Sequence, residues 1–157
     1  MSAHPIVHRH RAAGFTLLEM TIVLVVIGII ASIMVRAVRG TWVAASRRSA
    51  DRDVTVYLFR TRAVAIQQSR AAWLVRSGNV LKILVDSSGT PVQLGTQIDF
   101  MQRYGATLGA SPTDTVPFDP RGFAANVTQT PRVIVALGGR TDTMCVTGLG
   151  KIATRGC

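Results

Sequence analysis

The strongest constraint on this chain is a long apolar run close to its N-terminus. From Phe15 to Val35 the sequence holds 21 residues and a single charged side chain, Glu19. A helix of that length rises about 30 Å, which matches the hydrocarbon core of a bilayer. A cleaved secretory signal has a shorter apolar region of about 7–15 residues, and no clear small-x-small cleavage site follows this run. The run therefore predicts a transmembrane helix over residues 15–35.

Glu19 is the second constraint, because it is the only Glu in the chain and it lies inside the apolar run. A charged group in a membrane span costs about 2.5–3.5 kcal/mol on insertion scales, so it normally has a partner. A plain membrane anchor does not explain such a carboxylate. If the chain is cut after Gly14, Phe15 acquires a free amine, and Glu19 of one subunit meets that amine in its neighbour. The carboxylate is then neutralised only in an assembly.

Residues 14–19 read GFTLLE, and this segment resembles the signature of type IV pilins and type II secretion pseudopilins. The resemblance implies that residues 1–14 are a leader peptide. A prepilin peptidase would cut between Gly14 and Phe15 and N-methylate Phe15, and Glu19 would act in fibre assembly. The leader contains a basic segment at 8–11, which favours a cytoplasmic N-terminus under the positive-inside rule.

The same resemblance implies a location and a set of partners. We expect a single-pass protein of the bacterial inner membrane, with its body in the periplasm, which enters a pseudopilus or pilus after assembly. The expected partners are the prepilin peptidase and other pseudopilins or minor pilins in a complex at the fibre tip.

Residues 36–72 are predicted to extend the helix beyond the membrane. Apolar and small side chains recur there at steps of three and four residues, which is typical of one helix face. This stripe comprises Val54, Tyr57, Leu58, Thr61, Ala65, Gln68 and Ala72. No Pro occurs between Phe15 and Pro91, so one helix from Phe15 to about Arg70 is expected. The Arg side chains on its other faces, among them Arg48, Arg52 and Arg62, are either solvated or meet acidic neighbours in a fibre.

After Ala71 the apolar pattern changes to a period of two, which predicts strands. The expected strands are 73–75, 80–85, 97–100, 107–108, 133–137, 141–147 and 151–154, and 109–126 is expected to be a long loop with one short strand. The predicted fold class is α+β, with a long N-terminal helix packed on a small antiparallel β-sheet domain at 73–157.

The C-terminal half narrows the resemblance. Phe118 to Gly122 reads FDPRG, an alternating strand follows, and Cys145 to Gly148 reads CVTG. This order is similar to the GspH/FimT group, which implies a minor pseudopilin of a type II secretion system at the pseudopilus tip. The alternative in the same group is a FimT-like minor pilin that primes type IV pilus assembly. The span lacks the helix-kinking Pro common in major pilins, which favours a minor subunit.

The two cysteines, Cys145 and Cys157, both lie near the C-terminus. In the periplasm, an oxidising compartment, the expected state is a disulfide between them. Such a bridge would contribute about 3 kcal/mol, mainly by constraining the unfolded chain. Two free thiols are the alternative.

The sequence offers no catalytic set. His4, His8 and His10 all lie in the leader, so a processed chain would have no histidine as a general base or metal ligand. The Asp residues after Ala71 are scattered over turns. We therefore expect a structural protein that is not an enzyme and that holds no cofactor and no metal.

A possible nucleic-acid site is the basic C-terminal segment. Some FimT-type pilins bind DNA through a segment resembling GRxR, and the corresponding stretch here carries Lys151 and Arg155, with Arg140 as a further candidate. Positions 151 and 155 would share one face of an alternating strand, where both would contact a phosphate backbone. The alternative, which we favour, is that these are ordinary exposed charges on an edge strand.

Overall fold

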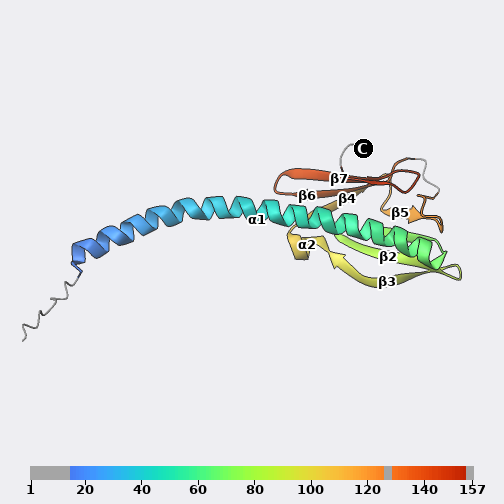
Figure 1. Ribbon diagram of the computed structural model, residues 1–157, viewed down its shortest axis with the longest axis horizontal. Helices are drawn as coiled ribbons and strands as arrows, with labels where there is room; N and C mark the ends of the chain where they lie inside the picture. Colours follow the sequence, from blue (N-terminus) through green and yellow to red (C-terminus); the bar gives the residue numbers. More distant parts are fainter. Residues whose placement is uncertain (1–14, 126–128, 155–157) are drawn as a thin grey trace, which may run out of the picture. The chain divides into compact units, whose positions relative to one another are not determined.

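The computed structural model describes residues 15–125 and 129–154. The chain divides into two compact units, Met1–Arg39 and Gly40–Cys157. The helix α1 (Leu17–Gln68) contributes residues to both units, and two antiparallel sheets complete the second unit (Figure 1). The predicted α+β class is therefore confirmed.

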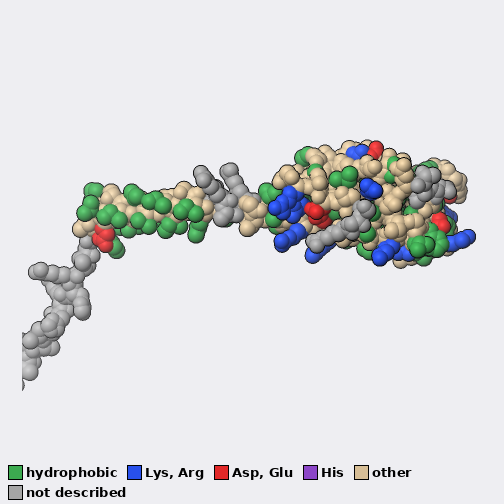
Figure 2. Space-filling view, turned by 90° about the horizontal axis from the view of Figure 1, so that it is seen from above, with side chains coloured by type: hydrophobic (Ala, Val, Ile, Leu, Met, Phe, Trp, Pro, Cys, Tyr) green, Lys and Arg blue, Asp and Glu red, His purple; other side chains and the backbone are tan. Residues whose placement is uncertain are grey.

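The first unit contributes an apolar helical segment. Over Leu17–Met34 the mean hydropathy is 2.6 and none of the segment is buried within the protein. Figure 2 shows hydrophobic side chains along the whole of this segment. By length and composition the segment qualifies as a membrane span, since an unburied apolar helix of this size is not the core helix of a soluble domain.

In the second unit, α1 ends where the backbone of Ser69 takes a positive φ of 50°. The N–H of Arg70 donates to the carbonyl of Ala65 at 3.2 Å, which satisfies one of the last helix carbonyls. The strand β1 (Ala72–Ser77) follows at once. Ala72 was assigned to the helix extension from the sequence, and this boundary was wrong because the chain turns at Ser69.

The strands form two sheets of four instead of the one small sheet that was expected. The first sheet has the order β3-β2-β1-β5 and the second the order β4-β6-β7-β8, with antiparallel neighbours throughout. Their remaining bounds are β2 (Val80–Ser87), β3 (Thr90–Asp99), β4 (Thr107–Ser111), β5 (Thr115–Phe118), β6 (Arg132–Leu137), β7 (Arg140–Val146) and β8 (Ile152–Ala153). The strand patterns alone could not reveal that β5 returns to pair with β1.

A short helix, α2 (Phe100–Tyr104), replaces the end of the strand predicted at 97–100. The carboxylate of Asp99 accepts hydrogen bonds from the N–H groups of Met101 and Gln102, at 2.9 and 3.1 Å. Gly105, in the left-handed conformation, ends the helix. An Asp cap and a Gly stop therefore override the β-like pattern around Phe100.

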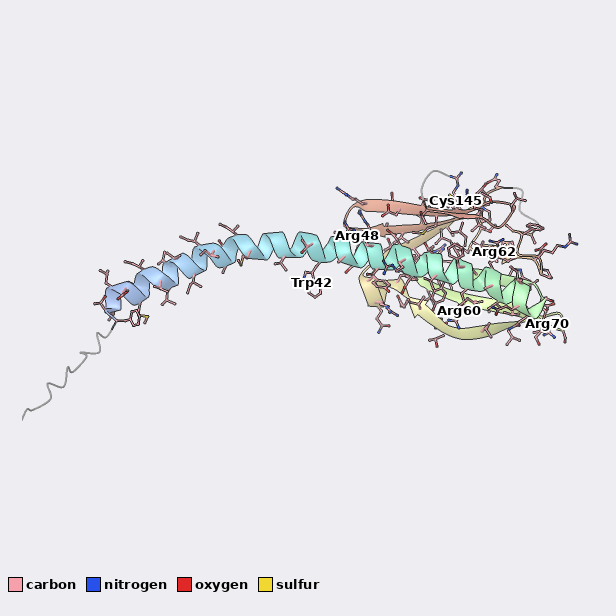
Figure 3. The ribbon with its side chains drawn as sticks, in the orientation of Figure 1. Trp42, Arg48, Arg60, Arg62, Arg70 and Cys145 are labelled. Atoms are coloured by element: carbon pink, nitrogen blue, oxygen red, sulfur yellow. The ribbon has the colours of Figure 1, made fainter. Side chains whose placement is uncertain are left out.

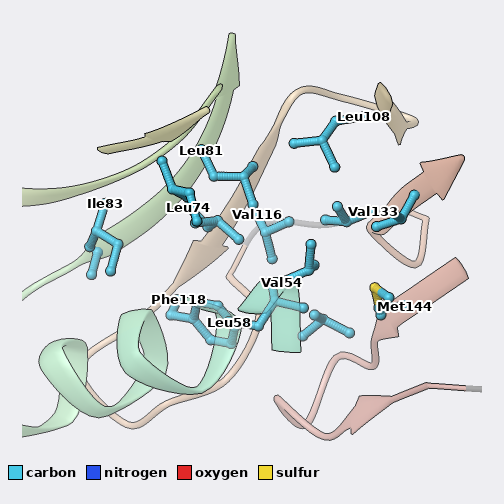
Figure 4. Packing of buried hydrophobic residues seen from close by; sticks show 14 of the residues in the cluster. Val54, Leu58, Leu74, Leu81, Ile83, Leu108, Val116, Phe118, Val133 and Met144 are labelled. Atoms are coloured by element: carbon cyan, nitrogen blue, oxygen red, sulfur yellow. The ribbon is translucent and has the colours of Figure 1, made fainter. Parts of the chain in front are cut away.

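The core of the second unit lies between α1 and the two sheets. Val54, Leu58, Thr61 and Ala65 of the predicted helix stripe are completely buried, whereas Gln68 is exposed. Figure 4 shows Val54 and Leu58 close to apolar side chains from both sheets. The sheets contribute Leu74, Leu81, Ile83, Leu108, Val116, Phe118, Val133, Val135, Met144 and Val146.

Candidate assembly site

The start of α1 is organised by Thr16. Its hydroxyl oxygen accepts a hydrogen bond from the N–H of Glu19 at 3.2 Å, and its carbonyl accepts one from the N–H of Met20, also at 3.2 Å. Thr at the N-cap with Glu three positions later is the capping-box pattern. The positive end of the helix dipole also favours a carboxylate in the first turn. Glu19 thus occupies a position that its own helix stabilises electrostatically.

Both Phe15 and Glu19 are exposed, Phe15 to 73%. The ion pairs recorded for the described residues are Arg47–Asp142 and Arg76–Asp114, and neither involves Glu19. Gly14, the other half of the predicted cleavage site, lies outside the described residues. The structure therefore leaves the side chains of Phe15 and Glu19 exposed on the single chain.

Cys145 lies on β7, where it is buried and pairs with Ala153 of β8. Its predicted partner, Cys157, lies outside the described residues, so the disulfide stays a prediction. The strand β8 is only two residues long. A covalent link just beyond it would hold the end of the chain against β7.

Of the predicted DNA-contacting residues, Arg140 and Lys151 lie apart. Arg140 begins β7 next to the tight turn at Gly138 and Gly139, whereas Lys151 lies near the other end of β7, where its carbonyl accepts from the N–H of Thr147. At about 3.3 Å per residue the two ends of β7 are about 20 Å apart. Both side chains are exposed. Arg155 lies outside the described residues, so its shared face with Lys151 stays a prediction.

A charged cluster that the sequence did not suggest joins α1 to β7. Arg47 Nε lies 3.2 Å from Asp142 Oδ2, and Asp51 lies beside the same carboxylate. Burial, followed by the charge and hydrogen bonding of Asp142, raises the pKa of Asp51 from 3.8 to about 6, and Arg47 partly opposes this rise. Arg48, Asp51 and Asp142 also line an opening of about 200 Å³. No local pattern predicts this pairing, because the two Asp residues are far apart in the chain.

Arg62 has a structural role within its own chain, which neither of the two alternatives from the sequence had included. Its Nε donates to the carbonyl oxygen of Gly122 at 2.9 Å, and its side chain is partly buried. Gly150 packs on the same carbonyl so closely that any Cβ there would collide with it. Figure 3 shows Arg62 on the side of α1 that faces these loops. Arg62 therefore fixes the loop around Gly122 and the turn before β8 to the helix.

Comparisons with known proteins agree with these features. The family described as the prokaryotic N-terminal methylation motif matches residues 9–35, which include the predicted cleavage site and most of the apolar segment. No curated protein matches the chain. The chain therefore combines a prepilin-type N-terminal motif with a fold in which a long helix packs on antiparallel sheets, as in type IV pilin-like proteins.

Among solved structures, this chain is similar to the type IV minor pilin FimU of Pseudomonas aeruginosa. One crystal structure, in space group P21, matches with a TM-score of 0.60 and 17% identity over 72% of this chain and 90% of FimU. A second, in space group P65, matches with a TM-score of 0.56 and 18% identity over 69% and 92% of the two chains. These matches confirm the type IV pilin-like fold.

Proposed function

We propose that this chain is a structural minor subunit of a pilus-like fibre. It is made as a prepilin, cut after Gly14 by prepilin peptidase and N-methylated on Phe15. The observation that carries the proposal is the methylation motif at residues 9–35, followed by an unburied apolar helix and a FimU-like fold. The apolar segment anchors the subunit in the inner membrane before assembly, and the second unit lies in the periplasm.

Glu19 provides the proposed assembly contact. Its carboxylate is exposed within a membrane-length apolar segment, which supports a contact with the N-terminal amine of Phe15 on a neighbouring subunit. An unpaired charge there costs about 2.5–3.5 kcal/mol. Pairing with the amine removes that cost, so assembly is favoured over the isolated subunit in the bilayer.

Two machines could use such a subunit. The similarity to FimU supports a minor pilin that helps to prime a type IV pilus. The absence of Pro from the apolar segment favours a minor subunit over a major pilin, and the GspH/FimT-like order of motifs in the C-terminal half fits a minor pseudopilin of a type II secretion system as well as a minor pilin. Deleting the gene in its native bacterium separates the two, since the first predicts loss of surface pili and the second predicts loss of secreted proteins.

Processing is tested directly by intact-mass and N-terminal peptide analysis of the chain expressed with and without a prepilin peptidase. We expect peptidase-dependent loss of residues 1–14 and a methyl group on Phe15. A chain that keeps its first 14 residues in the presence of an active peptidase would overturn the proposal.

A further inference from the structure

The part of α1 in the second unit has an exposed stripe as well as a buried one. The exposed stripe, here called the outer seam, consists of Arg52, Val56, Phe59 and Ile66, with the half-buried Ala63 between the last two. Val56, Phe59 and Ile66 are 50%, 52% and 45% exposed. Steps of four, three, four and three residues are the heptad spacing with which one helix packs along another.

Packing of the core does not explain why the outer seam is apolar. The opposite face of α1, at Val54 and Leu58, already fills the core of the unit completely. A surface helix normally needs only that one apolar face. A second apolar row at helix-packing spacing therefore indicates a partner helix. The mixture of aromatic, aliphatic and Arg side chains is also that of protein interfaces, whereas a nucleic-acid surface is dominated by charge.

The charges around the outer seam restrict the partner. Arg48 and Arg52 are exposed at its N-terminal end. The carboxylates on the same stretch are engaged elsewhere, because Asp51 lies beside Asp142 and Asp53 accepts a hydrogen bond from the Tyr104 hydroxyl. The seam therefore presents positive charge and no exposed carboxylate over residues 48–66.

A second copy of this chain does not fit the outer seam. Subunits anchored by N-terminal membrane helices run in parallel, and the proposed contact of Glu19 with the neighbour's Phe15 offsets them by four residues, or about 6 Å. In such a pair of identical chains, Arg48 of one copy would lie level with Arg52 of the other. Like charges facing each other across an interface oppose association. A partner with Asp or Glu at these positions would instead gain attraction from both arginines.

From these observations we infer that the outer seam docks the α1 helix of a different fibre subunit, one with carboxylates opposite Arg48 and Arg52 and apolar side chains opposite Phe59 and Ile66. This inference rests on the proposed function and adds a selection rule to it. The chain enters the fibre beside an acidic neighbour and does not polymerise with itself.

The experiment places the photocrosslinker benzoylphenylalanine at position 59 of the full-length chain in its native cells. Because it replaces an exposed Phe, the substitution is conservative. After irradiation, adducts from sheared fibres and membranes are mapped by peptide mass spectrometry. We expect an adduct to the helix of another pilin-like chain, next to an Asp or Glu. A self-adduct as the main product, a nuclease-sensitive adduct to DNA, or no adduct from a chain that is present in fibres would overturn the inference.

Charge reversal supplies the specificity control. Arg48→Glu/Arg52→Glu should lower the adduct to the other subunit at least about tenfold, which corresponds to about 1.4 kcal/mol. Arg132→Glu/Arg140→Glu changes the net charge equally on exposed strand positions and should leave the adduct unchanged. Equal loss in both double variants would overturn the role of the seam charges.

Co-expression gives a positive test. Tagged wild type and Arg48→Glu/Arg52→Glu chains present complementary charges, so they should form a mixed self-adduct that wild type alone does not. Failure of the mixed adduct to form would contradict the electrostatic exclusion of self-pairing. If the wild-type chain is absent from fibres altogether, the proposed function fails; if it is present without the predicted adduct, only the inference fails.

Discussion

The two parts of α1 differ in how their side chains are used. Over Leu17–Met34 the helix is apolar on all sides and none of it is buried in the protein. Within the second unit the same helix has a fully buried face at Val54 and Leu58 and a partly exposed outer seam with Arg52 at one end. The first part suits a uniform apolar solvent, and the second suits two different protein surfaces.

This difference shows why one helix can serve two steps of an assembly. In the first part a single charged side chain, Glu19, stands out because everything around it is apolar. In the second part charge is common, and its meaning depends on which face carries it. Arg62 fixes loops to the helix, whereas Arg48 and Arg52 face outward. The same residue type therefore stabilises the unit at one position and is available to a partner at another.

The largest effect is expected from Glu19→Gln. Glutamine keeps the capping-box geometry at the third helical position but removes the charge. We expect cleavage and methylation to continue, and incorporation into sheared fibres to fall by at least about tenfold because the amine of the neighbouring Phe15 loses its counter-ion. Immunoblots of sheared fibres and membranes from the same cells measure the ratio.

Glu19→Asp is the matched control for that variant. It keeps the carboxylate, so incorporation should recover at least in part. Normal incorporation of Glu19→Gln would show that the carboxylate has no assembly role and that Glu19 serves only as a helix-capping residue.

Leu58→Ala and Phe59→Ala change neighbouring residues on the two faces of α1 in the second unit, so their effects on stability compare those faces. Leu58 is fully buried and Phe59 is 52% exposed. Leu58→Ala should cost about 2–4 kcal/mol by leaving a cavity, whereas Phe59→Ala should change the free energy of unfolding by less than about 0.5 kcal/mol. Denaturant unfolding of the full chain in detergent micelles measures both. Equal destabilisation would mean that the outer seam belongs to the core of the unit.

Local patterns in the sequence predicted the elements that depend on neighbouring residues. The apolar run, the helix stripe around Leu58 and the alternating strand at Val133 and Val135 are read from their own periodicity. The helix α2 was missed because the Asp99 cap and the Gly105 stop were not given weight against an apolar pattern. Their order in the sequence, an Asp directly before the helix and a Gly directly after it, was a signal that could have identified α2.

Long-range relations were not predictable in the same way. The pairing of β5 with β1 and the anchoring of Arg62 on Gly122 depend on segments brought together only by the fold. The same holds for the meeting of Asp51 and Asp142. In contrast, the candidate assembly residues Phe15 and Glu19 are neighbours on one helix end, so their relation was accessible from the sequence.

A smaller effect is expected at Asp51, on the flank of α1 between its two faces. Its pKa is raised from 3.8 to about 6 in the folded chain, first by burial and then by Asp142. Between about pH 4 and pH 6 the folded state therefore holds a proton that the unfolded state has released, so stability falls as the pH rises through this window. Asp51→Asn removes this loss and should raise the melting temperature by about 1–3 °C at pH 7.5.

Thermal unfolding of wild type and Asp51→Asn at pH 4 and pH 7.5 checks this prediction. The melting temperatures of the two chains should lie closer together at pH 4, where the carboxyl is protonated in the folded wild type and still partly protonated in the unfolded state. A variant that is less stable at pH 7.5 would show that the Asp51 carboxylate is needed as a partner of Arg47.

The smallest effect is expected from the basic residues of the strands. Arg140 and Lys151 lie at opposite ends of β7, so they would not contact the same phosphate group. We expect Lys151→Ala to leave the DNA affinity of the full chain in detergent within about twofold of wild type, since one exposed phosphate contact contributes little.

A mobility-shift titration near physiological salt measures this affinity, with Arg48→Glu/Arg52→Glu run beside it. Loss of binding in Lys151→Ala, with a salt dependence reduced by about one ion, would reassign the end of β7 and the segment toward Arg155 to DNA binding. Loss of binding only in Arg48→Glu/Arg52→Glu would instead show that the outer seam binds DNA. The second part of α1 would then differ from the first by binding a nucleic acid and not by binding a partner helix.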